Sequence, residues 1–131
     1  MNNKLDKILA EISAGELIDK MTILEIKKAK INDIKKLKDI EKELSSLRIT
    51  FKKFIPNSSK IRPLINNLKL INLKLWNIEN KKRLAEKNNQ FDEKFIELAR
   101  NVYKNNDERA KIKLKINNIL GSNIKEAKSH F

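Results

Sequence analysis

The chain has 131 residues, of which 40% are hydrophobic, with only 2 Gly and 2 Pro, a formal charge of +13 and no Cys. This length suits one domain with one core, and the scarcity of Gly and Pro favours helices. The absence of Cys excludes disulfides and Cys-based metal or redox chemistry, and a single His, His130, argues against His-based catalysis. No apolar run approaches the about 18 residues that span a bilayer, and the first dozen residues lack a signal-peptide core. We therefore expect a cytoplasmic protein without a membrane partner.

Five helices are expected from the spacing of apolar residues and from residues that begin or end helices. Two capping-box patterns mark helix starts, Ser13 with Glu16 and Asn105 with Glu108. Gly121 is suited to a helix end. The expected helices cover residues 14 to about 31, 34–54, 60–86, 92–104 and 105–120.

Short connections between these helices predict that neighbours pack antiparallel. The expected fold is an all-α, single-domain antiparallel helical bundle of about five helices, with a short polar C-terminal tail from residue 122. The helices over 34–54 and 60–86 are the longest of those expected and should form the central hairpin. Ile124 and Phe131 are the tail residues that could dock on the bundle.

The arginines are the most informative charged residues. Lys outnumbers Arg 25 to 5, and Lys, Asn and Ile together make up 61 residues, which indicates an AT-rich coding sequence. Codon drift should turn tolerant arginines into lysines. An Arg that persists is therefore expected to use its planar fork, which holds a carboxylate or a phosphate bidentately. Three of the five lie near acids in the second half of the chain: Arg83 near Glu79, Arg100 near Glu97 and Arg109 near Asp107.

These charged residues, together with Lys113, form the candidate ligand-binding site. Glu97 and Arg100 share one helical face, and Arg109 and Lys113 share a face of the next expected helix. Free N–H groups at a helix N-terminus near Asn105 would help to hold an anion. The alternative is that these are a helix cap and surface pairs contributing about 0–1 kcal/mol each. The candidate ligand-binding residues are Glu79, Arg83, Glu97, Arg100, Asp107, Arg109 and Lys113.

Trp76 has two interpretations. It could be a buried core residue with neighbours such as Leu68 and Val102, or it could form the wall of a ligand pocket beside Glu79 and Arg83.

A magnesium site is a further alternative. Glu16 and Asp19 lie three residues apart and could bind Mg²⁺ with Glu79 or Glu97 from a facing helix. The capping box already accounts for Glu16, and no denser acidic motif is present. We therefore expect no metal and no cofactor.

The charge of +13 raises the alternative of nucleic-acid binding. Many of the cations are lysines scattered over expected solvated faces, such as Lys27, Lys35 and Lys52. Interleaved aromatic residues and recognised nucleic-acid-binding modules are both absent from the sequence. A nonspecific nucleic-acid binder would show a steep salt dependence of its affinity.

Several segments resemble a bacterial family of short proteins of unknown function. The segments are Glu11–Lys27, Leu75–Glu79, Phe95–Tyr103, Asn106–Ala110 and Leu120–Ser122. Their order along the chain is specific and covers most of it outside residues 54–69. The resemblance implies that the candidate site residues belong to a recurring pattern, and it supplies no activity.

The sequence favours a protein that binds an anionic small molecule, such as a phosphorylated or sugar-nucleotide metabolite, at its Glu/Arg/Lys cluster. Any reaction would use arginines to stabilise negative charge and a carboxylate as the base. The main alternative is a noncatalytic, oligomeric interaction module that uses Leu and Ile exposed on the second and third helices. Nonspecific nucleic-acid binding is the third hypothesis.

Overall fold

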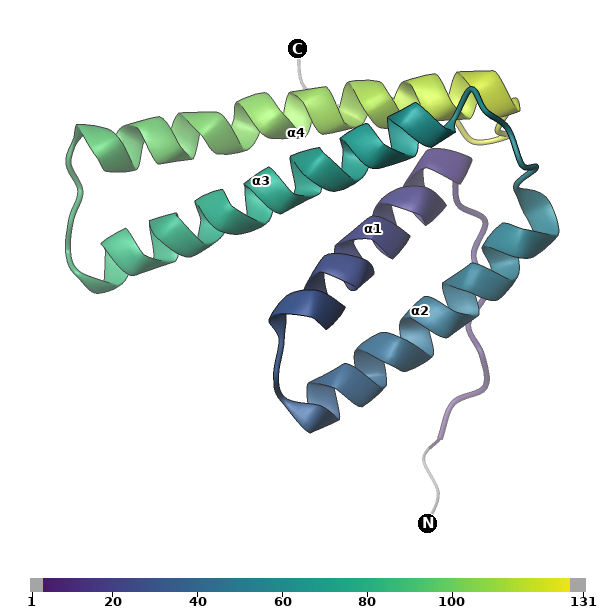
Figure 1. Ribbon diagram of the computed structural model, residues 1–131, viewed down its shortest axis with the longest axis horizontal. Helices are drawn as coiled ribbons and strands as arrows, with labels where there is room; N and C mark the ends of the chain where they lie inside the picture. The colour runs from purple at the N-terminus through teal and green to yellow at the C-terminus, as the bar shows by residue number, and fades with distance from the viewer. Residues whose placement is uncertain (1–3, 128–131) are drawn as a thin grey trace.

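The computed structural model describes residues 4–127, and within this range the chain forms four α-helices and no strands. Two helical hairpins cross at an angle, the longer one made by the third and fourth helices (Figure 1). The predicted all-α bundle is confirmed. Within the described residues, no helix is long and apolar enough to cross a membrane. The helices are α1 (Ala14–Lys30), α2 (Ile34–Phe54), α3 (Arg62–Lys87) and α4 (Glu93–Leu120).

Helix α1 is the centre of the arrangement. It packs against α2, α3 and α4, whereas α2 packs lengthwise against neither α3 nor α4. The expected central hairpin of the second and third helices is therefore wrong. The reason is the distribution of apolar residues, because α1 buries residues around most of its circumference and α2 buries only Ile40 and Leu44. A helix with a narrow apolar stripe can cover one neighbour, and a helix that is apolar on several faces must be surrounded.

Two apolar clusters hold the four helices together, and α1 contributes to both. Ile18 packs with Leu68 of α3 and Ile116 of α4, and all three are at most 2% exposed. The second cluster lies between α1 and α2 and contains Leu24, Ile40 and Leu44. Burying one such aliphatic side chain contributes about 1.5–3 kcal/mol.

Side-chain caps fix three of the helix starts. Ser13 accepts from the Glu16 N–H, Asp33 from the N–H groups of Lys35 and Lys36, and Asp92 from the Phe95 N–H. These contacts satisfy N–H groups that have no partner inside the helix. At the end of α4, Gly121 has a φ of +64°, the left-handed conformation that favours glycine at this position. The predicted starts at residues 14 and 34 and the stop before Gly121 are confirmed.

The helix break predicted at Asn105 is wrong. Residues 93–120 form the single helix α4, and the Asn105 side chain donates to the Asn101 carbonyl one turn earlier. Asn and Asp weaken a helix by less than about 0.7 kcal/mol each, so the long packing of α4 against α3 outweighs the local preference. Without a helix N-terminus at residue 105, the expected anion contact with free N–H groups there is also absent.

Candidate functional site

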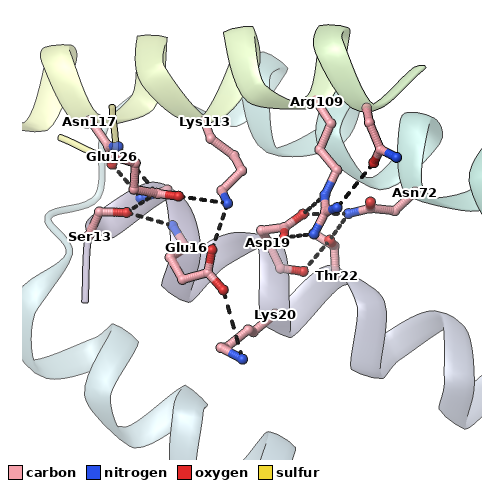
Figure 2. A network of polar contacts seen from close by, with 12 residues as sticks. Ser13, Glu16, Asp19, Lys20, Thr22, Asn72, Arg109, Lys113, Asn117 and Glu126 are labelled. Atoms are coloured by element: carbon pink, nitrogen blue, oxygen red, sulfur yellow. Dashed lines mark hydrogen bonds and ion pairs between the residues drawn. The ribbon is translucent and has the colours of Figure 1, made fainter. Parts of the chain in front are cut away.

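The centre of α1 contains a buried carboxylate, that of Asp19, which is 0% exposed. The guanidinium of Arg109 binds it bidentately, with Nε donating to Oδ1 at 2.9 Å and Nη2 donating to Oδ2 (Figure 2). Asn72 of α3 donates through Nδ2 to Asp19 Oδ1 and to Thr22 Oγ1, each at 2.8 Å. The Thr22 hydroxyl donates to the Asp19 carbonyl at 2.8 Å. We call these four residues the Asp19 network, and they join α1, α3 and α4.

Arg109 therefore uses its planar fork as expected of a retained arginine, with a different partner from the one predicted. The partner is Asp19, 90 residues earlier in the chain, and Asp107 takes no part. The hydrogen bond with Asp19 raises the pKa of Arg109, against the opposing effect of partial burial. Because a buried carboxylate needs its charge compensated, this pair links the position of α4 to that of α1.

A second polar cluster lies beside the first, nearer the start of α1. The Lys113 ammonium is 2.6 Å from Glu16 Oε2 and 2.8 Å from Glu126 Oε2 (Figure 2). Glu126 Oε1 accepts a hydrogen bond from the hydroxyl of Ser13 and one from Asn117 Nδ2. We call Ser13, Glu16, Lys113, Asn117 and Glu126 the Glu126 network. It ties the C-terminal tail to the N-terminus of α1.

Charge pairing in the Glu126 network outweighs burial for both of its main members. Burial raises the pKa of Glu126, but hydrogen bonds from Lys113, Ser13 and Asn117 leave it below its ordinary value. Burial likewise lowers the pKa of Lys113, but hydrogen bonds to Glu126 and Glu16 leave it above its ordinary value. Both groups are therefore charged at neutral pH, and each is occupied by a protein partner.

The first turn of α1 lies very close to α4. The N–H of Gly15 donates to Asn117 Oδ1 at 2.6 Å, and the N–H of Ala14 donates to Ser122 Oγ at 3.1 Å. A Cβ atom added to Gly15 would lie 2.6 Å from the Lys113 carbonyl oxygen. Glycine is required here by close backbone approach, which explains its occurrence inside a helix.

An open groove adjoins the Asp19 network. Its volume is about 500 Å³, within the range of roughly 300–1,000 Å³ usual for small-molecule sites. Helix α3 supplies six lining residues, α4 supplies three at i, i+4 and i+7 spacing, and α1 adds the apolar side chains of Ile23 and Ile26. We call this the Trp76 groove; its walls include Trp76, Asn80 and Arg83 from α3 and Val102, Asn106 and Arg109 from α4.

Trp76 forms part of the wall of this groove. Trp76 is mostly buried, as expected, and it also lies beside Glu79 and Arg83 in a pocket wall, so the structure combines the two interpretations. The reason is that α1 and α2 cover only part of the α3–α4 hairpin. At the level of Trp76, the groove stands open to solvent.

Of the seven predicted site residues, the structure brings three into the Trp76 groove, namely Glu79, Arg83 and Arg109. Lys113 lies one turn beyond Arg109 and belongs to the Glu126 network. Glu97, Arg100 and Asp107 do not line the groove. Nine residues on a continuous helix correspond to two and a half turns, so Arg100 and Arg109 point to opposite sides of α4. They do not share a site.

Sequence reasoning missed several residues that the structure places in these clusters, and it weighed Asp19 only as a metal ligand. Asp19 and Asn72 are polar residues inside otherwise apolar stripes, and that interruption was the available signal. Asn80 and Asn106 gave no signal, because their common groove depends on how α3 and α4 align. Glu126 lies in the tail, whose contact with Ser13 spans 113 residues of sequence.

Two of the carboxylates weighed as magnesium ligands have other partners. Asp19 is held by Arg109 and Asn72, and Glu16 pairs with Lys113. Among residues 4–127, no group of three or more His, Cys, Asp or Glu residues is placed to hold a metal ion.

The comparison with known families agrees with the sequence resemblance. No curated protein and no solved structure gives a significant match to the chain. Residues 8–131, nearly the whole chain, match a family described as a family of unknown function, DUF6165. The protein therefore belongs to the DUF6165 family.

Proposed function

We propose that the Trp76 groove binds an anionic small molecule, of the phosphorylated or sugar-nucleotide class, through the guanidinium of Arg83. One observation carries the proposal. Arg83 lines the groove, and no residue within 4–127 pairs with its guanidinium. A guanidinium presents hydrogen-bond donors in a fork that matches a phosphate or carboxylate, which makes a free one at a groove wall suited to an anion.

Of the other charged groove residues, Arg109 favours an anion and the Glu79 carboxylate opposes one. The fork of Arg109 is occupied by Asp19, so Arg109 forms a fixed wall and adds positive potential. Glu79 is 3.6 Å from Lys82, one turn away on the same helix, and this surface pair is weak. Apolar side chains on the α1 side reduce the local dielectric constant, which strengthens an ion pair formed at Arg83.

The test is a thermal-shift screen of phosphorylated metabolites with two matched variants. Arg83→Gln and Arg100→Gln each remove one exposed charge that has no partner within residues 4–127, and of the two only Arg83 lines the groove. A ligand present at 100 times its Kd stabilises the native state by about 2.7 kcal/mol. We expect this stabilisation in the wild type and in Arg100→Gln and its loss in Arg83→Gln. The proposal would be contradicted if a compound stabilised both variants equally. It would also be contradicted if no compound stabilised the wild-type protein.

A second candidate function is self-association, and the N-terminal arm, residues 4–12, favours it. The arm has no regular secondary structure, although its apolar residues follow the helical spacing i, i+3, i+4, i+7. Leu5 is 78% exposed, Ile8 82% and Leu9 89%. Large aliphatic side chains at such exposure mark a surface that a partner covers.

Sedimentation equilibrium tests this second function. We expect Leu5→Ser/Leu9→Ser to reduce association, and added salt to strengthen it, because two chains of charge +13 repel each other at low ionic strength. Leu84→Ser, which removes a 59% exposed leucine from α3, is the matched control. A wild-type chain that stays monomeric at high concentration and high salt would exclude self-association.

A further inference from the structure

We infer that the ligand of the Trp76 groove carries a flat heteroaromatic ring in addition to its anionic group, as a nucleoside phosphate does. The inference rests on the function proposed above and adds the chemical class of the ligand. It depends on three features of the groove: the Trp76 indole in its wall, the amide groups that keep unused donors or acceptors, and their spacing from Arg83.

The indole of Trp76 is available for stacking. Its ring makes no aromatic, cation–π or hydrogen-bonding contact within residues 4–127. Val102 of α4 and Ile23 and Ile26 of α1 line the same groove, so an aromatic face meets aliphatic side chains across it. Such walls offer apolar contacts to a planar ring. Each base stacked on an aromatic side chain is held by about 1–3 kcal/mol.

Two side-chain amides lie where the edge of such a ring would need hydrogen bonds. Asn80 has no partner within the described residues, and Asn106 uses only its oxygen, which accepts from Arg109 Nη1 at 3.3 Å. An amide offers both a donor and an acceptor, and this combination suits the polar edge of a nucleobase. A simple sugar phosphate has hydroxyls for the amides and no planar aromatic ring for the indole.

The spacing from Trp76 to Arg83 separates the ring contact from the charge contact. Both lie on one face of α3, seven residues apart, which is about 10 Å along the helix axis. A ligand that reaches both needs its ring and its anionic group joined by a spacer. In a nucleoside phosphate, the sugar is that spacer.

The first experiment uses the fact that Trp76 is the only tryptophan of the chain, so that intrinsic fluorescence reports on this groove alone. The wild-type protein is titrated with nucleoside mono- and diphosphates of the four common bases, and with ribose 5-phosphate and inorganic phosphate. We expect at least one nucleotide to quench the fluorescence and to bind about tenfold more tightly than ribose 5-phosphate. We expect the two compounds that lack an aromatic ring to bind without quenching.

Calorimetric titration of variants separates the proposal of anion binding from the inference of an aromatic ring. Trp76→Leu should abolish the preference for the nucleotide over ribose 5-phosphate, and Arg83→Gln should weaken both. Asn80→Ala, an exposed position outside the core, should change the preference among bases. If wild-type protein binds ribose 5-phosphate as tightly as every nucleotide, the ring inference is wrong and anion binding stands. If no phosphorylated compound binds, both proposals are wrong.

Discussion

The Asp19 network and the Trp76 groove are neighbouring regions built from the same three helices, and they differ in whether their charged groups have protein partners. In the network, every charged atom has a protein partner, and Asp19 is completely buried. In the groove, the Arg83 guanidinium has no partner within residues 4–127. Arg109 belongs to both regions, because its guanidinium binds Asp19 and the residue also lines the groove. Two retained arginines thus have two uses: Arg109 fixes helix positions, and Arg83 is available to a ligand.

The largest effect should come from removing the partner of Asp19. Arg109→Met keeps an apolar stem and leaves a buried carboxylate without its cation, which should lower the free energy of unfolding by about 3–5 kcal/mol in urea denaturation. Adding Asp19→Asn removes the unpaired charge, so the double variant should be more stable than Arg109→Met alone. Arg100→Met, at an unpaired exposed site of the same helix, should change stability by less than about 0.5 kcal/mol. A loss below about 1 kcal/mol in Arg109→Met would mean that the network does not hold α1 and α4 together.

A smaller loss is expected at the close contact of α1 and α4. In Gly15→Ala, the added Cβ would lie 2.6 Å from the Lys113 carbonyl oxygen and 2.9 Å from Asn117 Oδ1. Overpacking of this kind costs about 1–3 kcal/mol, more than the gain in helix propensity from Ala of about 0.5–1 kcal/mol. Chemical denaturation measures the net change, and amide exchange in α1 should become faster. Gly121→Ala is the control, because nothing lies within 4 Å of its added Cβ. Its cost is backbone strain at a φ of +64°, far from α1 along the chain, so amide exchange in α1 should stay slow. A more stable Gly15→Ala protein would show that the two helices separate at little cost.

The Glu126 network should contribute a pH-dependent stability of roughly 1 kcal/mol or less, because it is partly exposed. The pKa of Glu126 is lowered on folding, so its contribution is present above the ordinary Glu pKa of about 4.3 and is lost as the pH falls through the lowered value. The pKa of Lys113 is raised, so its contribution is present below the ordinary Lys pKa of about 10.4 and is lost as the pH rises through the raised value. Glu126→Gln should flatten the acid side of the stability profile and leave neutral-pH folding intact. An unchanged acid profile would mean that the tail is not held by this carboxylate.

The smallest effect on stability should come from Arg83, the residue on which the proposed binding depends. Arg83→Gln removes an exposed charge that has no partner within residues 4–127, so the unliganded free energy of unfolding should change by less than about 0.5 kcal/mol. A decrease in the free energy of unfolding of more than about 1 kcal/mol would show that Arg83 supports the fold. The proposed function would then lose its basis, which is that Arg83, unlike Arg109, is not needed for stability.

Local chemistry made much of the fold predictable. Ser13, Asp33 and Gly121 act within a few residues of themselves, so the starts of α1 and α2 and the end of α4 could be read from the sequence. The same reasoning failed at Asn105, where a pattern typical of a cap lies inside a helix. Caps are worth about 1 kcal/mol, and the packing of α4 along α3 outweighs that amount.

The sequence by itself determined the all-α class and most helix bounds, and it indicated the arginines as the informative charged residues. Only the tertiary structure decided that Arg109 meets Asp19, because these residues are 90 positions apart and their contact depends on how α4 crosses α1. It also decided that Trp76, Asn80 and Arg83 share a groove with Val102, Asn106 and Arg109, since that follows from the alignment of two antiparallel helices. Helix formation depends on neighbours within about four residues, whereas a site depends on helix faces that meet only after the chain has folded.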